Sequence, residues 1–431
     1  MSVAFALTLV LILLLASIGT PVALAVISGG ILFLIIDGQD IALAGQQMLT
    51  GLYASFVLLA VPLFILAANI MNSGSISDRL LNFCVACFGR FKGGLGHVNV
   101  TASLIFSGMS GSAVADAAGI GRIIINMMTR EGRYPAGYAA AITAASATIG
   151  PIIPPSIPMV MYAMVAGQSI GYLFLAGIIP GLLMGATLMT ANGYLARKRN
   201  YKIEQPVPLS ELPYATSHAL PALIMPGILL YGIYGGLTTP TEAAAIAGAY
   251  ALLLSVFFYR AYSINNLYQV FVESARSSAS IGLIIGAALV VNYIVASENI
   301  PSMITSQLVH LDVHPLMFLL IVNLLILLLG ALLDATTIIL VILPLFIPGC
   351  RELGIDLLHF GIVAIINCMI GLITPPYGVL LFVINAVTDI SLREIISEIW
   401  PFLFILLGAL LTLIALPDLV LWLPRLFGYD N

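Results

Sequence analysis

Apolar runs of about 20 residues, the length that crosses a bilayer as a helix, recur from the N-terminus of the chain to Leu423. The polar gaps between them are too short to hold a separate soluble domain. Hydrophobic residues make up 61% of the 431 positions and charged residues only 8%, against about 25% charged residues in a soluble domain. Because a helix satisfies its own backbone hydrogen bonds in lipid, the sequence predicts an all-α, multi-pass membrane protein whose main surroundings are the lipid bilayer.

Two halves of the chain share a motif that places a Pro-Pro pair inside an apolar run. Residues 148–155 and 369–376 both carry Ile-Gly-x-Ile-x-Pro-Pro, at an offset of 375 − 154 = 221 residues. The same offset carries Arg130-Glu131 onto Arg351-Glu352, so the match extends beyond one motif. Such self-similarity predicts a duplicated unit, with a first repeat at 1–202, a linker at 203–214 and a second repeat at 215–431.

Each repeat also contains a polar interruption ahead of its Pro-Pro pair. In the first repeat this is the small-residue cluster Ser107–Ala113, which lets a helix break and turn back within the membrane. We therefore expect a re-entrant hairpin at about 95–128 and a broken helix at about 135–166. The second repeat is expected to have its hairpin at about 315–349 and its broken helix at about 358–388.

With a re-entrant hairpin, each repeat makes five full crossings, and an odd number turns the second copy upside down relative to the first. The basic residues agree with this topology if Arg90, Lys92, Arg130 and Arg133 all face the cytoplasm. Arg351 and Arg425 would then be external exceptions. Transporters built from inverted repeats place their sites near the midplane, where helices are interrupted.

The Pro-Pro breaks predict cation sites. Proline lacks an amide hydrogen and obstructs the carbonyl one turn back, so each break frees carbonyl oxygens where there is no bulk water. Hydroxyls of Ser107, Ser110, Thr148 and Thr374 add ligands, and the mostly neutral oxygens favour sodium over calcium. A kinked helix satisfied by neighbouring Ser and Thr side chains is the alternative for either break.

Charged and amide side chains inside the apolar runs are candidates for coupling or for substrate contact. Asp116 and Asp334 either cap the second helix of their hairpins or bind an ion or proton. Arg122 either holds a substrate carboxylate or extends toward the membrane surface. Asn385 either contacts substrate or ties two helices together.

In combination, four motifs of this chain resemble the large membrane subunit of the TRAP (tripartite ATP-independent periplasmic) transporters, over essentially the full length. They are Ser107-Gly-Met-Ser-Gly-Ser-Ala-Val-Ala-Asp116, Gly150-Pro-Ile-Ile-Pro-Pro155, Thr239-Pro-Thr-Glu-Ala243 and Gly371-Leu-Ile-Thr-Pro-Pro376. The resemblance implies a sodium-coupled importer of an organic acid, such as sialic acid or a C4-dicarboxylate, in a bacterial inner membrane. It implies two partners, a periplasmic substrate-binding protein and a small four-helix membrane subunit. It also implies an elevator mechanism, in which hairpins and broken helices move as one block.

The resemblance further implies two or more sodium sites and no organic cofactor. The residues carried over for the two sodium sites are Ser107, Ser110, Gly150, Ile153 and Pro155 for one, and Gly330, Gly371, Thr374 and Tyr377 for the other. The substrate is expected between these sites, near Arg122, Asp116, Asp334, Pro154, Pro375 and Asn385.

Two other functions compete with this interpretation. A stand-alone ion-coupled carboxylate carrier would have the same hairpins but no binding protein. An intramembrane enzyme would need a His/acid or paired-acid constellation at depth, and the five histidines all fall near the ends of the predicted spans. We therefore expect no enzyme activity. The chain offers no P-loop, and no basic, aromatic-interleaved patch that predicts a nucleic-acid partner.

Overall fold

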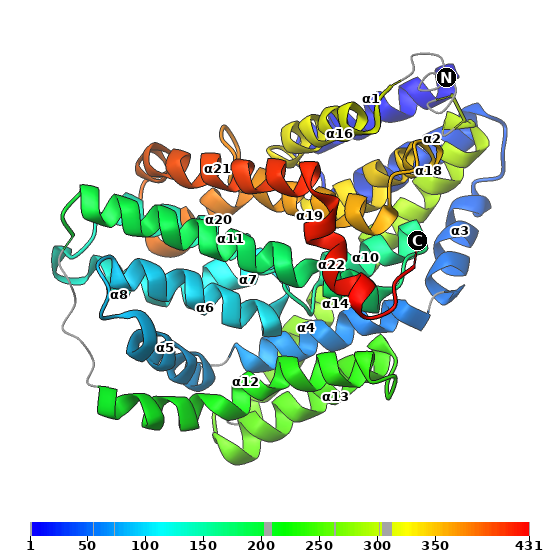
Figure 1. The fold of residues 1–431 in the computed structure, drawn as a ribbon. Helices are drawn as coiled ribbons and strands as arrows, with labels where there is room; N and C mark the ends of the chain where they lie inside the picture. The colour runs from blue at the N-terminus through cyan, green and yellow to red at the C-terminus, as the bar shows by residue number, and fades with distance from the viewer. Residues whose placement is uncertain are drawn as a thin grey trace.

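The computed structural model describes residues 2–54, 56–72, 74–201, 209–262, 264–300, 302–303 and 313–430. Within these ranges every regular element is a helix (Figure 1). Half of the predicted linker at 203–214, residues 203–208, lies outside the described residues. The helices of the first half are α1 (Val3–Ser17), α2 (Val22–Ile36), α3 (Ala42–Ala54), α4 (Ala60–Met71), α5 (Gly74–Phe88), α6 (Gly94–Ser110), α7 (Ala113–Asp116), α8 (Arg122–Thr129), α9 (Ala136–Ala147), α10 (Ile157–Ala166) and α11 (Ile170–Lys198).

The second half follows with a similar sequence of long and short helices. They are α12 (Leu212–Tyr234), α13 (Pro240–Leu253), α14 (Ile264–Ser297), α16 (Pro315–Gly330), α17 (Ala335–Thr337), α18 (Ile347–Glu352), α19 (Leu357–Gly371), α20 (Val379–Thr388), α21 (Leu392–Ala415) and α22 (Pro417–Leu426). In Figure 1, α12 and α13 lie along one side of the molecule, and α1 and α16 lie along the opposite side.

Five helices among the described residues are long and apolar enough to cross a bilayer. They are Ile170–Lys198, Leu212–Tyr234, Pro240–Phe258, Asn265–Ser297 and Leu392–Ala415. Large apolar side chains are also exposed on these and other helices, such as Leu328, Phe404 and Trp422, each about 60% or more exposed. Together, the long apolar helices and the exposed apolar side chains identify a multi-pass membrane protein. A protein in water seldom leaves so many large apolar side chains uncovered.

Helix length separates α14 from the first two helices. The 34 residues of α14 extend about 50 Å, well beyond the roughly 30 Å hydrocarbon core. The polar segment from Ile264 to Arg276 continues into the apolar part of α14 without a break. Helices α1 and α2 have 15 residues each, which is about 22 Å and shorter than the core.

Both segments expected as hairpins are helix–turn–helix units. The first turns at Gly111, whose φ of 59° suits glycine, and Ser112 caps α7 by accepting a hydrogen bond from Ala115 N. The second turns at residues 331–334 between α16 and α17. The returning arm of each unit holds a π-helical turn, at Ala117–Gly121 and at Ile338–Ile342. Such turns often occur at functional positions.

Both Pro-Pro segments interrupt a helix. Helices α9 and α10 are separated by residues 148–156, and α19 and α20 by residues 372–378. Each break contains a cis peptide bond between its two prolines. The breaks differ in exposure, because Pro155 is buried whereas Pro376 is exposed.

Buried polar pairs join each hairpin to the broken helix of its own half. The Ser103 hydroxyl on α6 donates to the Ser146 hydroxyl on α9 at 2.9 Å. In the second half, Asn367 Nδ2 on α19 donates to Asn323 Oδ1 on α16, also at 2.9 Å. Hydrogen bonds of this kind between membrane helices contribute about 0.6 to 2 kcal/mol each. They hold a hairpin and a broken helix together as a pair.

Apolar packing divides into two clusters. The larger one runs through the hairpins, the broken helices, α4 and α11 to α13. The smaller one joins α1, α2 and the C-terminal part of α14, with Phe5, Phe33 and Val290 among its buried members. Helices α1 and α2 therefore have a core of their own.

Backbone contact between Gly330 and Gly371 predicts the cost of one methyl group. A β-carbon on Gly371 would lie 2.7 Å from the Cα and carbonyl carbon of Gly330. Because backbone atoms cannot rotate away, Gly371→Ala is expected to destabilise the protein by about 1–3 kcal/mol. Gly408→Ala on α21 is the control, because its β-carbon meets nothing within 4 Å. Thermal unfolding in detergent should show a lower midpoint for Gly371→Ala alone, and equal midpoints for both variants would contradict the contact.

Candidate functional site between the hairpin turns and the helix breaks

The turn of the first hairpin lies on the first helix break. A β-carbon on Gly111 would be 2.6 Å from the carbonyl oxygen of Pro155, and one on Gly108 would be 3.7 Å from that of Pro154. Only glycine permits such a close approach of backbone to backbone. The contact places Ser107 and Ser110 close to the break, where the sequence predicts a sodium site.

Asp116 supplies the strongest electrostatic feature of this junction. Its side chain is 2% exposed, and the Ser110 hydroxyl donates a hydrogen bond to Oδ1. The other oxygen, Oδ2, has no hydrogen-bond partner among the described residues and faces Gly150, whose β-carbon would lie 2.5 Å away. A buried carboxylate with an unpaired oxygen is costly, so a cation or a proton is needed to complement it.

The other residues predicted to bind the first cation offer either a hydroxyl oxygen or only their backbone. The hydroxyls of Ser107 and Thr148 donate to carbonyls of their own helices, at Leu104 and Ala145, each at 2.6 Å. Their oxygen lone pairs stay available to a cation. The Ile153 side chain packs against Gly181, which leaves only its backbone for coordination.

The second hairpin turn contacts the second break in a similar way. Gly330 and Gly371 touch backbone to backbone, and Gly378 N donates to the Ala331 carbonyl at 3.4 Å. The Thr374 hydroxyl donates to the Ile370 carbonyl at 2.8 Å. The Tyr377 side chain is 54% exposed and its ring packs on Phe382, with centroids 5.0 Å apart.

Asp334 and Asp116 occupy different positions relative to their helices. Asp334 caps α17, accepting hydrogen bonds from Thr337 N at 3.1 Å and from the Thr337 hydroxyl at 2.5 Å. In the first hairpin Ser112 does the capping instead. Asp334 is therefore the cap of its helix, whereas Asp116 lies within the first turn of α7 and does not cap it.

Two neighbouring cavities lie at these turns and share lining residues such as Ser112. The smaller, of about 170 Å³, lies between both hairpin turns and both breaks, with Ser112, Pro151, Asp334, Thr336 and Leu372 among its lining. The larger, of about 500 Å³, lies between the first turn and helices α4 and α14. Its polar lining residues are Asn69, Ser110, Ser112, Ser277 and Ser280.

Three of the polar lining residues escaped the sequence analysis. Asn69 lies on α4 and donates to the Ser274 hydroxyl at 2.9 Å, and Ser277 and Ser280 lie one turn apart on α14. The run of small residues at 277–280 inside a long apolar helix was the available signal. It did not reveal which hairpin would face it.

Four of the residues predicted to contact the substrate do not line either of these two cavities. Arg122 begins α8 with an exposed side chain and lines neither cavity. Asn385 Nδ2 donates to the Ile390 carbonyl at 2.7 Å, which ties the end of α20 to the loop after it. Pro154 is buried in the first break and Pro375 is half-buried in the second, and neither lines the two cavities.

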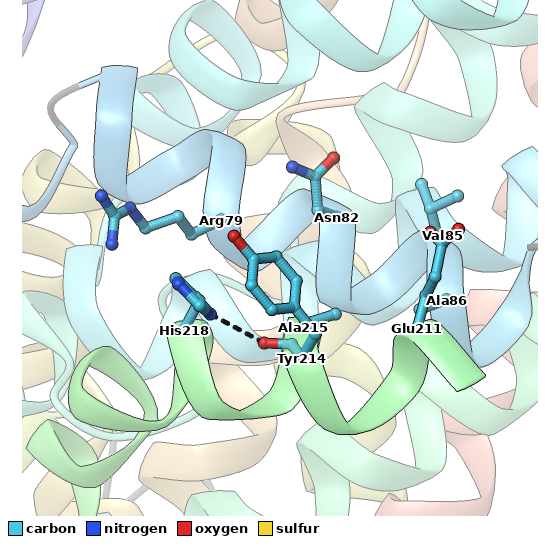
Figure 2. Close-up of a pocket in the computed structure, with 8 residues that line it drawn as sticks. All are labelled: Arg79, Asn82, Val85, Ala86, Glu211, Tyr214, Ala215 and His218. Carbon is cyan, nitrogen blue, oxygen red and sulfur yellow. Dashed lines mark hydrogen bonds between the residues drawn. The ribbon is translucent and has the colours of Figure 1, made fainter. Parts of the chain in front are cut away.

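A further cavity, of about 440 Å³, lies between α5 and α12. Figure 2 shows Arg79 and His218 toward one end of it and Glu211 toward the other. The Arg79 guanidinium lies 4.1 Å from the centroid of the Tyr259 ring. No residue of either hairpin turn or either break lines this cavity, so it is separate from the candidate site.

Comparisons with known proteins cover nearly all of the chain. The family model "Tripartite ATP-independent periplasmic transporter, DctM component" matches residues 5–419. The sialic acid TRAP transporter large permease protein SiaM of Vibrio cholerae is 40% identical over 415 residues, which is 96% of this chain and 97% of that protein. The C4-dicarboxylate TRAP transporter large permease protein DctM of Pseudomonas aeruginosa is 40% identical over 373 residues, covering 86% and 87%.

One solved structure shares the fold at low sequence identity. The crystal structure of the Alcanivorax borkumensis YdaH transporter superposes with a TM-score of 0.60 at 16% identity. The superposition covers 86% of this chain and 87% of that one. At this identity the likeness concerns the fold alone.

If the larger cavity is open to water, a cysteine placed in its wall will react with a water-soluble maleimide. In a Cys87→Ser background, where the other three cysteines are buried, Ser280→Cys should be labelled about tenfold faster or more than Ser274→Cys, because thiol reactivity requires access. Ser274 is 4% exposed and does not line the cavity. Equal labelling rates, followed by mass spectrometry, would contradict the cavity.

Proposed function

This chain belongs to the DctM-component family of tripartite ATP-independent periplasmic transporters and is a large permease subunit of that family, and we propose that it imports an organic acid driven by sodium. The substrate class follows from the relatives, which are named for sialic acid and for C4-dicarboxylates. The partners are a small four-helix membrane subunit and a periplasmic binding protein that delivers the substrate. The site of action is a bacterial inner membrane.

The observation that carries sodium coupling is the unpaired oxygen of Asp116. Gly150 of the break faces this oxygen, whereas the Ser110 hydroxyl of the hairpin bonds the other one. The Pro155 carbonyl contacts the adjacent turn. A sodium ion at this junction would meet a carboxylate oxygen, hydroxyls and carbonyls, which are the hard oxygen ligands such a cation requires. The carboxylate adds a charged ligand to the mostly neutral set expected from the sequence.

The second proposed sodium site, at Gly330, Gly371, Thr374 and Tyr377, has no carboxylate of this kind. Asp334 already accepts two hydrogen bonds from Thr337, so the ion there would be held by backbone carbonyls and the Thr374 hydroxyl. With less charge to attract it, we expect this second site to bind sodium more weakly than the first.

We further propose that the two halves are inverted repeats and that transport follows an elevator mechanism. The support is that each hairpin packs on one broken helix. Each hairpin is tied to the broken helix of its own half by a buried polar pair and by glycine contacts. These two pairs form the moving block, carrying the substrate between the hairpin turns. Helices α1, α2 and α14, with their own apolar cluster, belong to the frame, together with α4, α12 and α13.

Sodium coupling is tested by uptake into proteoliposomes that contain this chain, the small subunit and the binding protein. Sialic acid and succinate are offered with an inward sodium gradient or with potassium in its place. Uptake is expected only with sodium. Asp116→Asn should lower the sodium stimulation about tenfold or more, because a hydrogen bond or contact to a charged group contributes about 1.5–3 kcal/mol.

The control for Asp116→Asn is Asp78→Asn, which removes an exposed carboxylate from α5 and should leave the stimulation unchanged. Uptake at the same rate without sodium would exclude the coupling. A normal sodium response in Asp116→Asn would remove this carboxylate from the site.

The elevator is tested by locking the block to the frame. Gly108 on the first hairpin and Pro226 on α12 are in contact, with 3.2 Å between a Gly108 β-carbon and that of Pro226, close to the separation a disulfide needs. Oxidation of the Gly108→Cys/Pro226→Cys variant should stop uptake, and a reductant should restore it.

The matched control joins two helices of the frame. Gly30→Cys/Val290→Cys links α2 to α14, with 3.6 Å between the two β-carbons, and should tolerate oxidation without loss of uptake. Full uptake in the oxidised Gly108→Cys/Pro226→Cys variant, with the disulfide verified by mass spectrometry, would rule out movement at this contact.

A further inference from the structure

A cavity of about 610 Å³ lies where the turn between α5 and α6 meets the C-terminal part of α11. It shares no lining residue with the cavities at the hairpin turns. Its lining combines two cationic side chains, Lys92 and Arg197, with aromatic ones, among them Phe91 and Tyr194. The transport mechanism proposed above uses none of these residues.

The charges in this cavity are all of one sign. No Asp or Glu is among its lining residues, and neither Lys92 nor Arg197 forms an ion pair within the part of the chain that the structure describes. Lys92 is half-buried. Because the whole chain has a net charge of −4, this pair of unneutralised cations is a local concentration of positive charge that attracts an anion.

The walls of the cavity are apolar and open to the surroundings. Phe91 is 50% exposed and Tyr194 is 65% exposed. The His97 ring lies beside Phe91, with centroids 6.4 Å apart in an edge-on arrangement, and it also approaches Gly193 of α11. An anion that also carries a hydrocarbon part would cover these walls, whereas a small free anion would leave them exposed.

The position along α11 fits the depth of lipid headgroups. This helix has 29 residues, about 43 Å, which matches a bilayer including its headgroup regions. Arg197 is its next-to-last residue, and aromatic side chains are typical of this depth. Basic pockets between membrane helices at this level bind phospholipid headgroups.

We propose that this cavity binds an anionic phospholipid, with the phosphate group between Lys92 and Arg197 and an acyl chain along Phe91 and Tyr194. The lipid would contact α5, α6 and α11 at once. It would therefore stabilise the junction between α5 and the first hairpin.

Binding is measured on the purified full-length chain in detergent, by thermal unfolding during titration with phosphatidylglycerol. Phosphatidylcholine and inorganic phosphate are titrated separately. Phosphatidylglycerol is expected to raise the unfolding midpoint, and the other two are not. The Lys92→Gln/Arg197→Gln variant should bind phosphatidylglycerol about 30-fold more weakly, since each basic residue contributes about 1 kcal/mol and 1.4 kcal/mol is tenfold.

Lys198→Gln is the matched control, because Lys198 is the exposed neighbour of Arg197 but does not line the cavity. It should keep the wild-type affinity. The single variant Arg197→Gln, which changes an exposed side chain, replaces the double variant if the latter fails to fold. An unchanged affinity in both Arg197→Gln and the double variant would overturn the proposal. An equal midpoint shift with inorganic phosphate would show a free-anion site instead, and loss of the shift when the small subunit is added would show a protein contact there.

Discussion

The need to satisfy or cover every backbone polar group in lipid governs this structure. A helix broken at a Pro-Pro pair leaves carbonyl oxygens without partners, and hydrocarbon offers them none. The breaks persist because another part of the chain lies against each of them. Gly111 approaches the Pro155 carbonyl in one half, and Gly330 packs on Gly371 in the other. Each hairpin turn therefore covers part of the helix break on which it lies.

The carboxylates of the two hairpins nonetheless have different electrostatic surroundings. In the first half the turn is capped by the neutral Ser112, which leaves Asp116 buried with one unpaired oxygen. In the second half the carboxylate is itself the cap, and both oxygens of Asp334 accept hydrogen bonds from Thr337. The two hairpins thus hold one carboxylate that needs a cation or proton and one that does not. The first proposed sodium site therefore includes a carboxylate ligand, and the second does not.

Sequence reasoning reached the features that a few adjacent residues determine. The all-helical, multi-pass class and the family are confirmed. Both rest on features that short stretches of sequence show, namely the length of the apolar runs and the Pro-Pro motifs. The contacts of Asp116 with Ser110 and Gly150 depend on a turn and a break meeting in space, which no local pattern specifies. The same holds for Ser280, which lines a cavity only because α14 packs near the first hairpin. Arg122 was open to two roles, and its exposed position on α8 favours extension toward the membrane surface over contact with the substrate.

Coupling requires that ion and substrate act on a shared part of the protein, and Ser110 is such a part. Its hydroxyl donates to Asp116 at the proposed sodium site, and the same residue lines the larger cavity at the hairpin turn. In the proposed mechanism, a cation beside Asp116 pulls on the carboxylate that orients Ser110, and so changes the wall that the substrate meets. Because linkage is reciprocal, a substrate that prefers that wall raises the affinity for the cation by the same factor. In the proposed mechanism, this one serine makes the binding of the cation and the binding of the substrate depend on each other.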